Sequence, residues 1–186
     1  GVALQAGANM LGVIFAEASP RKATVAQAKE IVQAVQRYGE RDAPLSGELS
    51  KNLQALPSQD WFKSTESMLR KLTLRKPLTV GVFQNQSPSE INAIVEETGI
   101  DVVQLHGDEP ATFCDQVSVP CLRVLHVPLS KGIGEEAVDV DALVTNAKSF
   151  EGKAIALVLA SRTPGTSGGG TGATFDWEVV TKLGGV

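Results

Sequence analysis

Residues 78–105 read LTVGVFQNQSPSEINAIVEETGIDVVQL and hold an apolar strand, a capped helix and a second strand in succession. The run 78–83 is short and mostly apolar, which is typical of a strand buried on both faces of a parallel sheet. Residues 87–90 (Ser-Pro-Ser-Glu) combine an N-cap serine, a proline in the first turn and a glutamate three residues after the cap, and so predict a helix start. Gly99 ends that helix, and 101–105 supply the next strand.

The same alternation of apolar strands and helices extends along the chain. A helix begins after Thr24, where the sequence has a capping-box pattern, and ends near Gly39. Its apolar stripe consists of Ala28, Ile31, Val32 and Val35. The predicted strands are 10–15, 78–83, 101–105, 120–127 and 153–159; the predicted helices are 1–7, 24–39, 87–99, a short one after 106–110, one within 135–147 and one over 174–183.

Residues 40–76 interrupt this regularity. They are polar, with prolines at 44 and 57 and scattered charges. Leucines at 49, 53 and 56 indicate a helical turn or two, and apolar residues at 68, 69 and 72 indicate another. A connection this long is uncommon in a compact domain, so we expect an insertion that is partly helical or mobile.

Five strands that alternate with helices predict an α/β fold with a parallel sheet and right-handed crossovers. Two architectures satisfy this pattern: a flavodoxin-like open sheet, and five consecutive units of a (β/α)8 TIM barrel. Periodicity alone does not separate them. In both, the loops at the carboxyl ends of the strands carry the chemistry.

Composition excludes several functional classes. The 186 residues carry a formal charge of −4, which argues against a basic surface for nucleic acid or an anionic membrane. Aromatic residues make up 5%, too few for a base-stacking surface, and no apolar run approaches the roughly 18 residues of a membrane span. The two cysteines, Cys114 and Cys121, have no metal-site spacing, so a reducing cytoplasm is the expected compartment.

Candidate ligand-binding residues lie in the loops that follow the strands. Arg21 can grip a carboxylate or phosphate through two hydrogen bonds, or it is a solvated arginine. His106 ends a strand and can bind a substrate or transfer protons, or it orients its own loop. His126 lies in or just after an apolar strand, where a structural role is favoured. Residues 84–86 (Gln-Asn-Gln) are ordinary turn formers.

The loop 167–172 (Ser-Gly-Gly-Gly-Thr-Gly) is the richest in glycine. Its backbone amides can cradle an anion, although the Lys-Ser or Lys-Thr of a P-loop is missing. A flexible linker and a mobile lid are the alternatives. Without a catalytic triad, a metal-ligand set or a dinucleotide fingerprint in the sequence, these residues indicate an α/β domain that binds a small anionic metabolite.

At these loops the sequence closely resembles phosphoribosylanthranilate isomerase, an enzyme of tryptophan biosynthesis. The resemblance covers nearly the whole chain except the insertion at 40–76. That insertion and the style of the loops resemble the fungal members of the family, in which this domain is often part of a multifunctional tryptophan-pathway chain. The motifs that carry it are 7–15 (GANMLGVIF), 19–21 (SPR), 80–86 (VGVFQNQ), 101–109 (DVVQLHGDE), 169–172 (GGTG) and 175–177 (FDW).

The resemblance implies a (β/α)8 barrel and an Amadori rearrangement of a phosphosugar-anthranilate substrate, with no metal or organic cofactor. It implies that Arg21 pairs with the anthranilate carboxylate and that His106 lies at the mouth of the substrate site. It also implies that Gly169, Gly170, Thr171 and Gly172 fold over the substrate.

The sequence departs from the family pattern at the proton-transfer groups. The family's general acid is an aspartate after the apolar part of the sixth strand, and here Ala160 occupies that place. The family's general base is a cysteine on the first strand, which would precede Gly1; Cys114 and Cys121 fall elsewhere. The five strands would then be the second to the sixth of the barrel, with the phosphate-binding units after Val186.

Three hypotheses follow. The first is a phosphoribosylanthranilate isomerase domain that spans 1–186, with the insertion at about 40–76. We expect this chain to be inactive because Ala160 occupies the place of the general acid and the strand with the general-base cysteine is absent. The second is a non-catalytic module that binds anions or serves as a scaffold, and the third is a flavodoxin-like domain of unrelated function.

Overall fold

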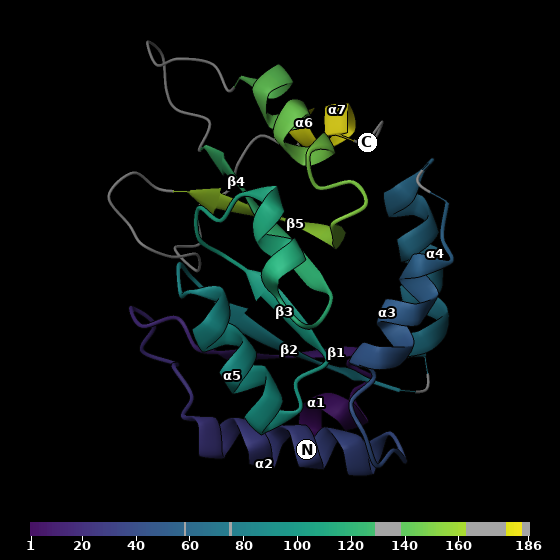
Figure 1. Cartoon of the computed structure of the whole chain (residues 1–186), viewed down its shortest axis with the longest axis vertical. Coiled ribbons are helices and arrows are strands. Elements are labelled where there is room, and N and C mark those ends of the chain that lie inside the picture. Colours follow the sequence, from purple (N-terminus) through teal and green to yellow (C-terminus); the bar gives the residue numbers. More distant parts are fainter. Residues whose placement is uncertain (58, 75, 129–138, 163–177, 184–186) are drawn as a thin grey trace.

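The structure is a computed structural model that describes residues 1–57, 59–74, 76–128, 139–162 and 178–183. In these residues, helices alternate with the strands of one five-stranded sheet (Figure 1). In chain order the elements are α1 (Val2–Gln5), β1 (Met10–Ile14), α2 (Val25–Tyr38), α3 (Ser46–Gln54), α4 (Trp61–Thr73), β2 (Leu78–Phe83), α5 (Pro88–Thr98), β3 (Val102–Leu105), the 3-10 helix η1 (Ala111–Gln116), β4 (Cys121–Pro128), α6 (Val140–Lys148), β5 (Ala154–Arg162) and α7 (Glu178–Leu183).

The strand order settles which α/β architecture the chain adopts. The sheet runs β1-β2-β3-β4-β5, and each strand pairs in parallel with the next one along the chain. A flavodoxin-like sheet places its second strand outside the first and reverses direction there, so that alternative is wrong. Sequential parallel strands joined by helices are the arrangement of consecutive units in a (β/α)8 barrel, as predicted.

The two predicted capping boxes are present. Thr24 Oγ1 accepts from the Gln27 amide at 3.2 Å, and Gln27 Oε1 accepts from the Thr24 amide at 2.9 Å. Ser87 and Glu90 make the same reciprocal pair at the start of α5. Each box satisfies two amides that the helix itself leaves free, which fixes where the helices after β1 and β2 begin.

The sheet buries a different core on each face, because successive strand residues point to opposite sides. Helices α2, α5, η1, α6 and α7 cover one face, where Val13, Phe83, Val103 and Leu125 belong to the larger core. Helices α3 and α4 cover the other, which we call the α3–α4 face. Its smaller core contains the strand residues Leu78, Val80, Val102, Leu122 and Ile155.

The insertion predicted at 40–76 is helical and packed. Leu45, Leu49 and Leu69 are buried against the first residues of the strands, so α3 and α4 cover the amino-terminal part of their face of the sheet. Trp61 Nε1 donates to the carbonyl of Ala154 at 2.6 Å, which ties the start of α4 to the start of β5. Although this segment is polar overall, each of its two helices has one apolar stripe that packs against the sheet.

A buried ion pair anchors this insertion to the sheet. Asp101, fully buried just before β3, accepts two hydrogen bonds from the Arg41 guanidinium, at 2.9 and 2.7 Å. It also accepts from the backbone amide of Leu45 at 2.6 Å and from both the amide and the hydroxyl of Thr79 at 2.8 Å. One carboxylate therefore joins the insertion, β2 and β3.

Several predicted details need correction. Ile31 is exposed rather than part of the α2 stripe, whereas Ala28, Val32 and Val35 are buried. Strand β5 continues to Arg162 instead of ending at residue 159, because its pairing with β4 extends that far. The predicted helices at 135–147 and 174–183 correspond to α6 and α7, and residues 135–138 and 174–177 lie outside the described residues.

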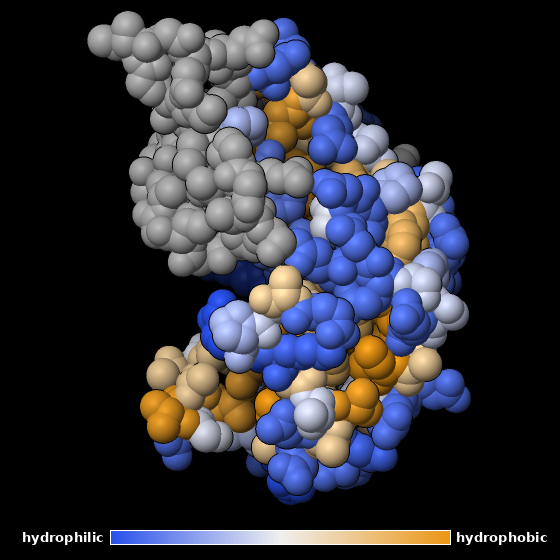
Figure 2. Space-filling model, turned by 90° about the vertical axis from the view of Figure 1, so that its left-hand side faces the viewer, coloured by the Kyte–Doolittle hydropathy of each residue, from blue (hydrophilic) through white to orange (hydrophobic). Residues whose placement is uncertain are grey.

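Figure 2 shows one face on which hydrophilic side chains dominate and hydrophobic ones come to the surface in separate patches. Within the described residues, no helix has both the length and the apolar character needed to cross a membrane. The exposed large apolar side chains are Val2, Met10, Ile31, Tyr38, Leu74 and Val158.

Candidate functional site

Four residues lie at the carboxyl ends of β3, β4 and β5, on the α3–α4 face. Gln104 lies two positions after Val102 on β3, and His106 follows two positions later. His126 lies four positions after Leu122 on β4 and pairs in register with Ala160 on β5, so these two side chains point to the same side of the sheet. We call Gln104, His106, His126 and Ala160 the carboxyl-end row.

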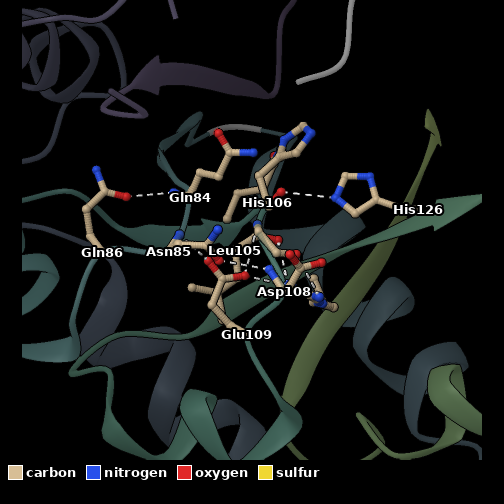
Figure 3. A network of polar contacts seen from close by, with 11 residues as sticks. Gln84, Asn85, Gln86, Leu105, His106, Asp108, Glu109 and His126 are labelled. Atoms are coloured by element: carbon tan, nitrogen blue, oxygen red, sulfur yellow. Dashed lines mark hydrogen bonds and ion pairs between the residues drawn. The ribbon is translucent and has the colours of Figure 1, made fainter. Parts of the chain in front are cut away.

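Two imidazole rings meet in this row. The ring centroids of His106 and His126 are 5.4 Å apart with a 48° angle between the planes (Figure 3). Burial lowers the pKa of His106 below the ordinary histidine value; the neighbouring His126 and Arg123 act in the same direction, and Glu109 opposes them. The surroundings of His106 therefore favour its neutral form.

This lowered pKa predicts a pH-dependent stability. The unfolded chain binds a proton on His106 more tightly than the folded protein does. The contribution of neutral His106 to folding stability is therefore complete above about pH 6.5 and is lost as the pH falls through the lower pKa of the folded state. Thermal melting of the full-length protein between pH 7.5 and 5 should show a steeper loss of stability for the parent than for His106→Asn. Parallel profiles for the two proteins would contradict the assignment.

Glu109 holds the loop that carries His106 against the loop that follows β2. Its carboxylate accepts from the Gly107 amide at 2.9 Å and from the Asn85 amide at 2.8 Å (Figure 3). Asn85 has a left-handed backbone, with φ of 61°, and its side-chain oxygen accepts from the Asp108 amide at 2.9 Å. A β-carbon on Gly107 would lie 2.1 Å from that oxygen, so the close approach of the loops requires glycine there.

Arg123 supports the contact that Glu109 makes between the two loops, and it does so from the opposite face of the sheet. Its guanidinium donates to Glu109 at 2.6 Å and to the Gly107 carbonyl at 3.0 Å, and it lies 5.4 Å from the centre of the Phe150 ring. Both members of the ion pair are almost fully buried. Neither Arg123 nor Glu109 is among the predicted site residues, yet a charged residue inside the apolar run 121–127 indicates a buried partner.

The residues 84–86 are more than turn formers. Gln86 Nε2 donates to the carbonyl of Phe15 at 2.8 Å, while Gln86 Oε1 accepts from the Gln84 amide at 2.6 Å. Gln86 therefore ties the loop after β1 to the loop after β2. Together with Glu109, it links the carboxyl-end loops of three successive strands.

The remaining predicted site residues have different placements. Arg21 is exposed in the loop between β1 and α2, and its backbone amide donates to Ser19 Oγ at 3.2 Å. Ala160 is half-buried within β5 rather than after the strand. Gly169, Gly170, Thr171 and Gly172 lie outside the described residues.

Neither cysteine belongs to the carboxyl-end row. Cys114 lies in η1, and Cys121 begins β4 at the opposite end of the sheet; both are buried free thiols. Among the described side chains, no group of three or more histidines, cysteines or carboxylates has the arrangement of a metal site.

The fold is that of a (β/α)8-type protein, a class in which active sites lie at the carboxyl ends of the strands. The chain belongs to the phosphoribosylanthranilate isomerase family: the family model described as N-(5'phosphoribosyl)anthranilate (PRA) isomerase matches residues 46–185. The N-(5'-phosphoribosyl)anthranilate isomerase of Komagataella pastoris is 31% identical over 98% of this chain and 70% of its own length. The tryptophan biosynthesis protein TRP1 of Phytophthora nicotianae is 42% identical over 95% of this chain, which spans about a third (32%) of that protein.

Solved structures agree on the fold. Phosphoribosyl anthranilate isomerase from Thermus thermophilus matches with a TM-score of 0.58 and 21% identity, over 99% of this chain and 64% of that one. A phosphoribosyl anthranilate isomerase in complex with reduced 1-(o-carboxyphenylamino)-1-deoxyribulose 5-phosphate matches with a TM-score of 0.52 and 18% identity, over 86% of this chain and 57% of that one.

Proposed function

We propose that this chain forms the substrate-binding core of a phosphoribosylanthranilate isomerase and that, with alanine at position 160, it binds substrate without turning it over. The reaction is the Amadori rearrangement of N-(5-phosphoribosyl)anthranilate to 1-(2-carboxyphenylamino)-1-deoxyribulose 5-phosphate. The observation that carries this proposal is the position of Ala160, which faces the same side of the sheet as His126 in the carboxyl-end row.

The reaction needs two positioned proton-transfer groups. A general acid protonates the furanose oxygen and opens the ring to a Schiff base, and a general base then removes the C2′ proton before the enolamine becomes a ketone. Each such group contributes about 10²–10⁴-fold in rate. In the pattern of the resembled family the acid belongs to position 160, where the methyl group of alanine has no proton to donate, and the base is a cysteine that neither Cys114 nor Cys121 matches.

Binding depends on different groups, which the substitution at 160 leaves in place. In this proposal Arg21 pairs with the anthranilate carboxylate, and its exposed guanidinium has no hydrogen bond or ion pair with any other described residue. Gly169, Gly170, Thr171 and Gly172 close over the substrate, and the reaction proceeds without a metal or organic cofactor. The buried free thiols of Cys114 and Cys121 fit a reducing cytoplasmic setting.

The relatives named as multifunctional proteins support further tryptophan-pathway domains as covalent partners of this one. The second candidate, a module that only binds anions, rests on the same alanine. Turnover in the variant with aspartate at 160 distinguishes a disabled enzyme from such a module.

Titration calorimetry tests the proposal with the reduced deoxyribulose phosphate compound as ligand. We expect the full-length protein to bind it, and Arg21→Met to bind about tenfold or more weakly, because a charge-assisted contact contributes about 1.5–3 kcal/mol. Lys29→Met, which removes an exposed charge from α2, is the control and should bind like the parent. Failure of the parent to bind at millimolar ligand would overturn the proposal.

A further inference from the structure

The two histidines of the carboxyl-end row have fixed and complementary tautomers. His126 Nε2 lies 3.1 Å from the carbonyl oxygen of His106. A carbonyl only accepts, so Nε2 of His126 carries the hydrogen and, in the neutral ring, Nδ1 is a bare lone pair. Gln104 Nε2 lies 3.4 Å from His106 Nδ1. An amide nitrogen only donates, so His106 accepts at Nδ1 and carries its hydrogen on Nε2.

The two remaining ring nitrogens have no partner. His106 Nε2 and His126 Nδ1 are both buried, and neither makes a hydrogen bond in the described part of the chain. A buried polar atom without a partner costs roughly 1–3 kcal/mol, so two such atoms side by side need an explanation, and a functional role is one. The pair therefore presents one donor and one acceptor, on rings whose centroids are 5.4 Å apart.

We propose that His126, together with His106, binds hydroxyl groups of the sugar part of the substrate: His126 Nδ1 accepts a hydroxyl hydrogen and His106 Nε2–H donates to a hydroxyl oxygen. This inference rests on the proposed function and adds a specificity residue to it. Because a hydroxyl both donates and accepts, one hydroxyl, or two on adjacent carbons, has the donor and the acceptor that the two nitrogens need.

The chemistry of the pair favours a hydroxyl over an anion. A carboxylate or phosphate oxygen has no hydrogen to give to the lone pair on His126 and would be repelled by it. A hydroxyl both donates and accepts, which matches the two nitrogens. Glu109 and Arg123, the charged groups that act on the pKa of His106, are bonded to each other at 2.6 Å.

Two substitutions of His126 separate binding from structure. In His126→Gln the amide nitrogen reaches the place of Nε2 and keeps the bond to the His106 carbonyl, but the acceptor at Nδ1 is lost. In His126→Asn the amide oxygen takes the place of Nδ1 and keeps the acceptor, but the bond to His106 is lost. If His126 has only a structural role, we expect asparagine to weaken probe binding more than glutamine does. If His126 binds a hydroxyl, we expect glutamine to weaken it more.

Calorimetry on the full-length protein, with the reduced deoxyribulose phosphate compound as probe, gives the test. We expect His126→Gln to weaken binding about tenfold and His126→Asn to change it less than about threefold. Inorganic phosphate and anthranilate carry no sugar hydroxyl, so both variants should bind them as the parent does. A parent that binds the probe and a glutamine variant that binds it equally well would overturn this inference while leaving the proposed function intact.

Imidazole nitrogen shifts from NMR give a second readout that does not depend on affinity. In their neutral forms both rings should show the tautomer that carries its hydrogen on Nε2, and the Nδ1 signal of His126 should move when the probe binds. A His126 ring protonated at Nδ1 would overturn the inference. A parent that binds no probe overturns the proposed function itself, which is a separate result from any difference between the variants.

Discussion

Ala160→Asp should raise the isomerase turnover of the full-length protein by about 10²–10⁴-fold, the usual contribution of one general acid. Position 160 is half-buried in β5, pairs in register with His126 and faces the same side of the sheet. An aspartate there would extend its carboxyl group from the strand into the carboxyl-end row. Glu109 and Gln86 hold the carboxyl-end loops after β1, β2 and β3 in place, and one of these loops carries His106.

Ala160→Asn is the matched control for this prediction. The amide has the shape of the carboxyl group but gives up no proton at neutral pH, so its turnover should stay at the parent level while the binding of the reduced compound is kept. The rates are measured by separating substrate and product chromatographically. Equal rates for the asparagine and aspartate variants would mean that position 160 does not supply the acid.

Asp101→Asn should destabilise the amino-terminal part of the sheet by about 3–5 kcal/mol, the typical cost of removing one partner from a buried ion pair. The substitution leaves the Arg41 guanidinium buried without its counter-charge. It also weakens the bonds from the amides of Leu45 and Thr79. Since these bonds join the insertion to β2 and β3, the loss should spread over all three.

Hydrogen exchange followed by mass spectrometry reports this change locally, even in a protein with other domains. Peptides from β2, β3 and α3 should lose protection in Asp101→Asn, and those from α6 should change less. Asp42→Asn removes an exposed carboxylate from the same segment and should leave exchange within about 0.5 kcal/mol of the parent. Unchanged protection of β2 and β3 in Asp101→Asn would refute the anchoring role of this carboxylate.

The sequence predicted those parts of the fold that local chemistry decides. Both capping boxes, at Thr24 and Ser87, are where the pattern placed them, because a cap is set by residues three positions apart. The strands are likewise short apolar runs whose neighbours on the chain are also neighbours in the sheet. Periodicity alone did not distinguish an open sheet from barrel units, because the strand order depends on pairing between distant residues.

The site was less predictable because its contacts are long-range. Glu109 and Arg123 are ordinary charged residues until β3 and β4 pair and bring them together. His126 was given a structural role; it does bond to the His106 carbonyl, but its ring also meets that of His106 beside Ala160. Arg21 was found from its loop position, and its role stays a prediction.

The isomerase rate of the unaltered full-length protein, assayed with N-(5-phosphoribosyl)anthranilate beside the Ala160→Asp variant, tests most directly whether the chemistry depends on a carboxylate at position 160. We expect the unaltered protein to bind the reduced compound yet to convert substrate about 10²–10⁴-fold more slowly than the aspartate variant. Conversion by the unaltered protein within tenfold of the aspartate variant would contradict it.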